Sequence, residues 1–189
     1  MKTLFAVLAF SFVAHAAPIP GTATSKLVSP EIGLYQSPAG FHMTAGKSGW
    51  SHVAPPKGNK FIATMYKAQP TSVAGQIHAD LHNVEPVPTA SLTVRVDDLD
   101  KEVPIEKYVQ KWMKEYPRYG FDVLGSKPFV QNKQKGFVLD IVNRDQRKQL
   151  RQVVFVKQKR AVILTCRDQV TTFQSSLKGC NEIIKSFVW

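Results

Sequence analysis

The sequence contains few cysteines and few acids, and after its first sixteen positions it has no long apolar run. Its two cysteines form no Cys-x-x-Cys motif, which argues against a catalytic or redox role. No later segment approaches eighteen consecutive apolar residues, so no further membrane element is predicted. Lys and Arg number 25 against 14 Asp and Glu, a formal net charge of +11. This excess of positive charge favours anionic partners.

The common catalytic motifs are also missing. There is no Gly-x-Ser-x-Gly nucleophile elbow and no His-Glu-x-x-His zinc motif. His78 and His82 are spaced i, i+4 and are weak candidates for a metal site, against the simpler interpretation of a solvated polar connection. No catalytic residue and no cofactor is predicted. An enzyme with dispersed residues would need at least two of His42, His52, His78 and His82 to converge with a carboxylate.

The first sixteen residues have the order of a secretory signal peptide. Lys2 supplies the basic region, residues 4–14 form an apolar run, and Ala14-His15-Ala16 is a small-x-small cleavage site. We therefore expect a signal peptide over residues 1–16, a flexible mature N-terminus over 17–30 and a single α+β domain over 31–189. The mature chain is expected to be periplasmic or secreted.

Apolar periodicity predicts an α+β fold. Short strands are expected at residues 32–35, 41–45, 61–68 and 91–96, and residues 70–89 are expected to form a long connection. An apolar stripe from Ile105 to Tyr116 follows the helical repeat, and a second helix is expected over residues 170–186. Between them, four strands separated by short polar turns imply an antiparallel meander. The predicted architecture is an antiparallel sheet of about six or seven strands sandwiched by two main helices.

Cys166 and Cys180 fall at the end of the last predicted strand and on the inner face of the last helix. In an exported protein an even number of cysteines favours a disulfide. Two buried apolar thiols are the alternative, because each cysteine lies inside a hydrophobic pattern.

Positive charge is concentrated between residues 126 and 160, where ten Lys or Arg residues accompany two acids, Asp140 and Asp145. Asp140 lies in an apolar strand and needs a partner, for which Arg151 on the next strand is the natural candidate. The basic residues either occupy the solvated face of the strands or form a contact surface for anions. The candidate surface comprises Arg144, Arg147, Lys148, Arg151, Lys157, Lys159 and Arg160.

The order of hairpin, strand, helix, meander and C-terminal helix resembles the PsbP-like group, which includes the extrinsic photosystem II subunit and bacterial exported relatives. The resemblance covers residues 32–189. It is carried by the early hairpin region with Trp50, by the helix start Pro104-Ile105-Glu106-Lys107-Tyr108, and by Ile183-Ile184-Lys185-Ser186-Phe187. It implies an α/β/α sandwich and a non-enzymatic accessory or binding role.

Together these features predict an exported binding or accessory protein that contacts an anionic envelope component or an acidic protein. Specific nucleic-acid binding is not predicted. A hydrolase or metal-dependent enzyme with dispersed catalytic residues is the alternative.

Overall fold

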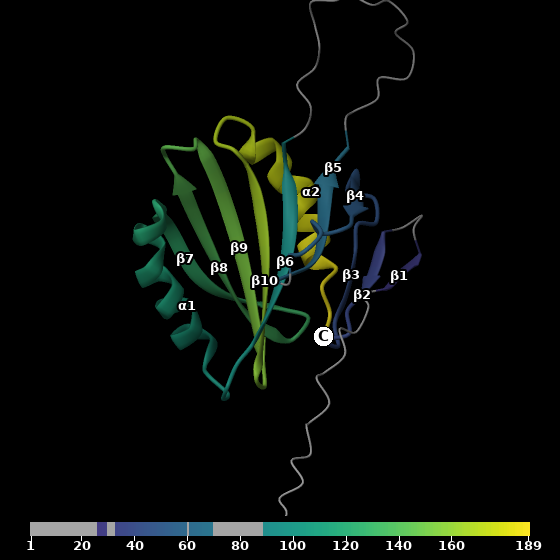
Figure 1. Cartoon of the computed structure of the whole chain (residues 1–189), viewed down its shortest axis with the longest axis horizontal. Coiled ribbons are helices and arrows are strands. Elements are labelled where there is room, and N and C mark those ends of the chain that lie inside the picture. Colours follow the sequence, from purple (N-terminus) through teal and green to yellow (C-terminus); the bar gives the residue numbers. More distant parts are fainter. Residues whose placement is uncertain (1–25, 30–32, 60, 70–88) are drawn as a thin grey trace, which may run out of the picture.

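The computed structural model describes residues 26–29, 33–59, 61–69 and 89–189. Within this part of the chain, seven strands form one antiparallel sheet in the order β4-β5-β6-β10-β9-β8-β7, and three form a smaller sheet in the order β1-β2-β3. Figure 1 shows the large sheet with one helix on each side. The elements are β1 (Lys26–Ser29), β2 (Leu34–Gln36), β3 (His42–Thr44), β4 (Trp50–Val53), β5 (Ile62–Ala68), β6 (Ser91–Asp98), α1 (Ile105–Glu115), a 3-10 turn (Tyr116–Tyr119), β7 (Asp122–Gln131), β8 (Gln134–Asn143), β9 (Lys148–Lys157), β10 (Arg160–Gln169) and α2 (Phe173–Lys185).

Each face of the large sheet carries its own hydrophobic core. The strands β8, β9 and β10 are apolar at successive positions, so their side chains enter both cores in alternation. On β9, Val153 and Phe155 face α2, whereas Leu150 and Val154 face α1. The predicted antiparallel sheet between two helices is therefore confirmed, and its physical reason is this two-sided burial.

Helix α1 covers β8 and β9 with the apolar stripe that the sequence predicts. Ile105, Tyr108 and Val109 are buried, and Tyr116 is buried at the C-terminal end of the stripe. Pro104 immediately precedes the first turn, where a residue without an N–H costs no hydrogen bond. Gly120 ends the following 3-10 turn with φ of 75°, a left-handed conformation that favours glycine.

Helix α2 packs on the opposite face and is covalently joined to the sheet. Cys166 of β10 and Cys180 of α2 form a disulfide with a Cα–Cα distance of 6.2 Å. Both residues are buried in the α2-side core. The disulfide interpretation is confirmed, and the alternative of two free thiols is wrong.

The small sheet is the part of the fold that local patterns did not predict. Residues 26–29, assigned to a flexible N-terminus, form β1 and pair with β2. The expected hairpin strands became β2 and β3 of this second sheet, and Trp50 begins an additional strand of the large sheet. The reason is that pairing partners are chosen by tertiary context, which a three- or four-residue segment does not reveal. The predicted signal peptide and the connection at residues 70–88 lie outside the described residues.

Candidate functional site

The predicted basic surface is divided between the two ends of the large sheet. Arg144, Arg147 and Lys148 lie at the β8–β9 turn, whereas Lys157, Lys159 and Arg160 lie at the β9–β10 turn. Lys148 and Lys157 are the two ends of β9, and at about 3.3 Å per residue they are about 30 Å apart. The seven residues therefore do not form one contact surface.

Arg151 does not contribute a free charge to either end. Its guanidinium forms a two-pronged ion pair with Asp140 on β8, with Nε–Oδ1 and Nη2–Oδ2 distances of 2.7 and 2.8 Å. The two residues are directly opposite in the β8–β9 register. This arrangement confirms the predicted partner of Asp140. Arg144 is also paired, through a 2.7 Å contact between its Nε and Asp122.

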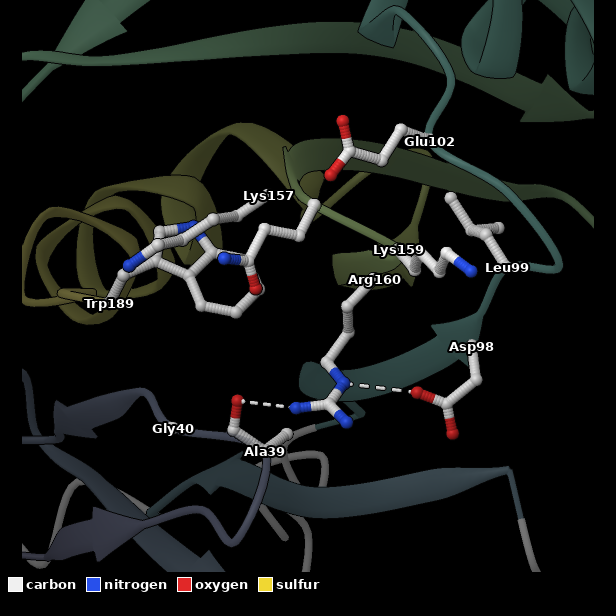
Figure 2. A pocket seen from close by; sticks show the side chains of 10 residues that line it. Ala39, Gly40, Asp98, Leu99, Glu102, Lys157, Lys159, Arg160 and Trp189 are labelled. Atoms are coloured by element: carbon white, nitrogen blue, oxygen red, sulfur yellow. Dashed lines mark hydrogen bonds and ion pairs between the residues drawn. The ribbon is translucent and has the colours of Figure 1, made fainter.

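The β9–β10 turn opens onto a hollow of about 510 Å³, which Figure 2 shows from close by. Arg160 is fixed at its rim by Asp98, with an Nε–Oδ1 distance of 3.0 Å, and donates to the carbonyl of Ala39 at 3.0 Å. The ammonium of Lys157 lies 5.6 Å from the centre of the Trp189 ring, a cation–π contact. The hollow thus combines cations with an aromatic face.

Two further lysines lie at the same end of the sheet. Lys133 lies in the β7–β8 turn and Lys135 follows it near the start of β8. This turn is adjacent to the β9–β10 turn because β8 and β9 are antiparallel neighbours. Lys135 also lines a hollow of about 420 Å³ together with Val156 and Gln158. Both lysines lie in or beside one of the short polar turns that separate the strands of the predicted meander. In an antiparallel meander, every second turn lies at the same end of the sheet. This rule would have placed the β7–β8 and β9–β10 turns, and their lysines, side by side.

We call this surface the hairpin end and define it by the basic residues of the two turns. The four lysines are exposed and form no ion pair within the described part of the chain. Carboxylates are also present, since Asp98 and Glu102 line the larger hollow. Because Asp98 is engaged by Arg160, the lysines retain most of the unpaired charge. The hairpin end consists of Lys133, Lys135, Lys157, Lys159 and Arg160.

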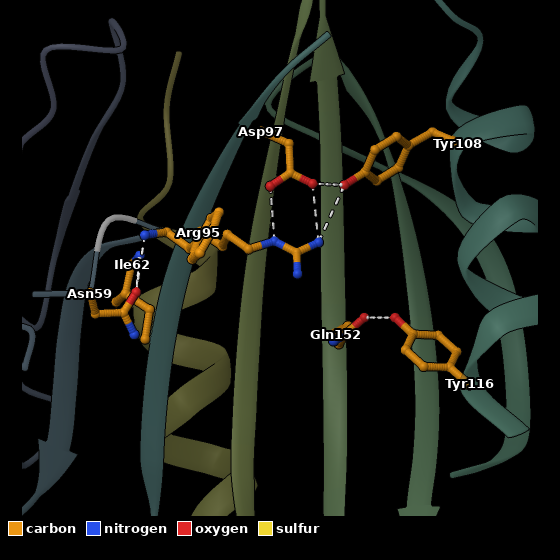
Figure 3. Close-up of polar contacts among 8 residues, drawn as sticks. Asn59, Ile62, Arg95, Asp97, Tyr108, Tyr116 and Gln152 are labelled. Atoms are coloured by element: carbon orange, nitrogen blue, oxygen red, sulfur yellow. Dashed lines mark hydrogen bonds and ion pairs between the residues drawn. The ribbon is translucent and has the colours of Figure 1, made fainter. Parts of the chain in front are cut away.

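Polar contacts join β6 and β9 to α1 and to the 3-10 turn that follows it (Figure 3). Arg95 contacts Asp97 at 2.9 Å and lies 4.7 Å from the centre of the Trp112 ring. Tyr108 donates to Asp97 at 2.5 Å, and Tyr116 donates to Gln152. Burial, together with the hydrogen bond and negative charge of Asp97, raises the pKa of Tyr108 well above its usual range. Burial also raises the pKa of Tyr116 to about 12, so both phenols stay protonated near neutral pH.

The described histidines do not form the site that a metal-dependent or hydrolytic mechanism would need. His42 is exposed on β3. His52 on β4 is stacked against Tyr35 and packs edge-on to Tyr66, and burial lowers its pKa. Within the described ranges, no three His, Cys, Asp or Glu side chains are placed to hold a metal ion. His78 and His82 lie outside those ranges.

Neither helix of the described chain is long and apolar enough to cross a membrane. No family model and no curated protein matches the sequence. Solved structures do match, although their sequences are only 12–13% identical.

The structural matches span most of the chain. The cyanobacterial PsbP protein, CyanoP, from Synechocystis sp. PCC 6803 aligns with a TM-score of 0.53 at 12% identity, over 93% of this chain and 98% of its own. PA94 from Pseudomonas aeruginosa, a protein of unknown function, aligns with a TM-score of 0.50 at 13% identity, over 84% and 96%. LpqN from Mycobacterium tuberculosis, involved in cell envelope biogenesis, aligns with a TM-score of 0.50 at 12% identity, over 74% and 78%. The α+β sandwich described above is therefore a PsbP-like fold.

Proposed function

We propose that this protein is an exported, non-enzymatic binding or accessory protein whose hairpin end contacts an anionic component of the cell envelope. The observation that carries the proposal is the set of four exposed lysines at two adjacent turns, which form no ion pair with any described residue. Such charges attract an anionic surface with about 1 kcal/mol for each Lys or Arg near it. The aromatic face of Trp189 beside Lys157 adds an amphipathic group suited to an interface.

Three further features support the assignment to the envelope. The first sixteen residues have the pattern of a signal peptide. The Cys166–Cys180 disulfide fits an oxidising compartment. One structural neighbour, LpqN, is involved in cell envelope biogenesis.

The test measures binding to vesicles of phosphatidylglycerol and to an acidic polysaccharide over a range of salt concentrations. Exposed charges are screened within about 10 Å at 0.1 M salt, so the affinity should fall steeply as salt rises. Lys157→Gln/Lys159→Gln should weaken binding about 25-fold, or about fivefold for each lysine. Lys114→Gln is the matched control, because Lys114 is an exposed lysine in the last turn of α1.

Two results would contradict the proposal. One is the absence of binding to either anionic probe at low salt, or binding that does not depend on salt. The other is an equal loss of affinity in the Lys114 control, which would indicate attraction to net charge rather than to the hairpin end. Binding to only one of the two probes would identify the envelope component.

A further inference from the structure

A second basic pocket lies on the sheet itself, at the end opposite the hairpin end. Lys67 of β5, Ser91 of β6 and Arg167 of β10 are directly opposite one another in the strand register. Cross-strand partners project from the same face of a sheet. Leu92, the chain neighbour of Ser91, enters the α2-side core, so this row projects from the α1 side.

The row is accessible because α1 covers a different part of this face. Figure 1 shows α1 beside β7 and β8, with β6 and β5 farther along the sheet. The helix packs mainly on β8 and β9. Its contacts with β6 are made at Arg95 and Asp97, four or more residues along the strand from Ser91. Beyond it, Lys67, Ser91 and Arg167 line a hollow of about 400 Å³, to which Lys148 of β9 also contributes.

Among the residues that the structure describes, three cations in this hollow have no carboxylate partner. Lys67, Lys148 and Arg167 form no ion pair within the described residues. Neighbouring strands are about 4.8 Å apart, so Lys67 and Arg167, two strands from each other, start from backbones about 10 Å apart. An anion between them would contact both side chains and relieve their mutual repulsion. Asp168 also lines the hollow, but its carboxylate accepts hydrogen bonds from Thr89, Ser176 and its neighbour's backbone N–H.

Ser91 supplies an independent sign of a ligand. The residue is only 2% exposed, and its Oγ makes no hydrogen bond within the described chain. A buried hydroxyl left without a partner costs about 1–3 kcal/mol, so such groups are rare in folded proteins. Its position between Lys67 and Arg167 provides a hydroxyl donor at the floor of a positively charged hollow.

We propose that this sheet-face pocket, formed by Lys67, Ser91, Lys148 and Arg167, binds the phosphate or sulfate group of a small anionic ligand. A tetrahedral oxyanion accepts hydrogen bonds on several sides at once, which matches two ammonium groups, one guanidinium and one hydroxyl. The hollow is larger than a bare ion, so it also accommodates part of the molecule that carries the group. The site is about 23 Å from the β9–β10 turn along β10, the distance from Arg160 to Arg167 at about 3.3 Å per residue.

The experiment is an NMR titration of the full protein with inorganic phosphate at constant ionic strength. We expect saturable shifts of the backbone amides of Lys67, Ser91 and Arg167. Arg167→Gln should weaken phosphate binding at least tenfold, because it removes a charged hydrogen-bond donor. Ser91→Ala should weaken it as well. Lys159→Gln, at the hairpin end, is the matched control and should leave the affinity unchanged.

Additional arms identify the source of the phosphate group. Glycerol 3-phosphate that competes with inorganic phosphate indicates a soluble ligand, whereas phosphatidylglycerol vesicle binding that depends on Arg167 indicates a lipid head group. Lys67→Gln keeps the test decisive should Arg167→Gln fail to fold, because Lys67 is exposed. Non-saturable shifts, shifts confined to the hairpin end, or unchanged affinity in both charge variants would overturn the proposal. These outcomes are separate from those for the hairpin end, which has its own variants.

Discussion

The disulfide between Cys166 and Cys180 should account for about 3 kcal/mol of the stability of this fold. The bridge closes a loop with a sequence separation of 14. For a loop of this size, the chain-entropy relation gives a loss of about 10 cal/mol/K in the unfolded state, which is about 3 kcal/mol at 25 °C. Because the bridge joins β10 to α2 inside the larger core, its removal should weaken the contact of the helix with the sheet.

Two preparations isolate this contribution. Wild-type protein in a reducing agent loses only the covalent bond, whereas Cys166→Ala/Cys180→Ala also loses the packing of two buried sulfur atoms. Urea unfolding should give a free energy about 3 kcal/mol lower for the reduced protein and somewhat lower again for the variant. For a chain of this size, the melting temperature should fall by about 6–12 °C.

The m-value, the slope of unfolding free energy against urea concentration, provides a second test of the same mechanism. Without the bridge the unfolded chain is more expanded, so the m-value should rise. A loss below 1 kcal/mol with an unchanged m-value would refute the argument that the bridge acts on the unfolded state. A large loss confined to the alanine variant would assign the stability to sulfur packing rather than to the covalent link.

Three other perturbations test the packing and the buried ionisable groups. Gly179→Ala should destabilise the protein by about 1–3 kcal/mol although alanine favours helices, because the added Cβ would lie 2.4 Å from Nε1 of Trp50. The control Lys178→Ala should change the unfolding free energy by less than about 0.5 kcal/mol. An equal change in both variants would contradict the steric argument. Burial raises the pKa of Asp168, but hydrogen bonds led by that from Ser176 outweigh this effect and lower the pKa below 3.8. The stability that the Asp168 carboxylate contributes should be complete above about pH 4 and lost as the pH falls through the lowered pKa. The unfolding free energies of wild type and Asp168→Asn should therefore converge in acid. Burial lowers the pKa of His52 below 6.5, so stability should decline as the pH falls from 6.5 towards that lowered value, and His52→Gln should remove this decline in a pH series of thermal melts.

The sequence by itself determined the elements whose signals are local and repeated. The helical stripe from Ile105 to Tyr116 and the continuous apolar runs in the meander strands are long enough for one apolar pattern to dominate. Successive apolar residues in β8 and β9 also required cover on both faces, which led to the two-helix sandwich. The pairing of Asp140 with Arg151 followed because adjacent strands in a short meander have few alternative registers.

Only the tertiary structure decided which distant residues share a surface. The pattern of basic residues along the chain placed Lys148 and Lys157 in one group, but the extended backbone of β9 carries them to opposite ends of the sheet. The reverse holds for Lys67 and Arg167, which are one hundred positions apart in sequence and become neighbours through β6. The physical reason is that sheet register depends on backbone hydrogen bonds between segments distant in sequence, and these bonds leave no local pattern in any one segment.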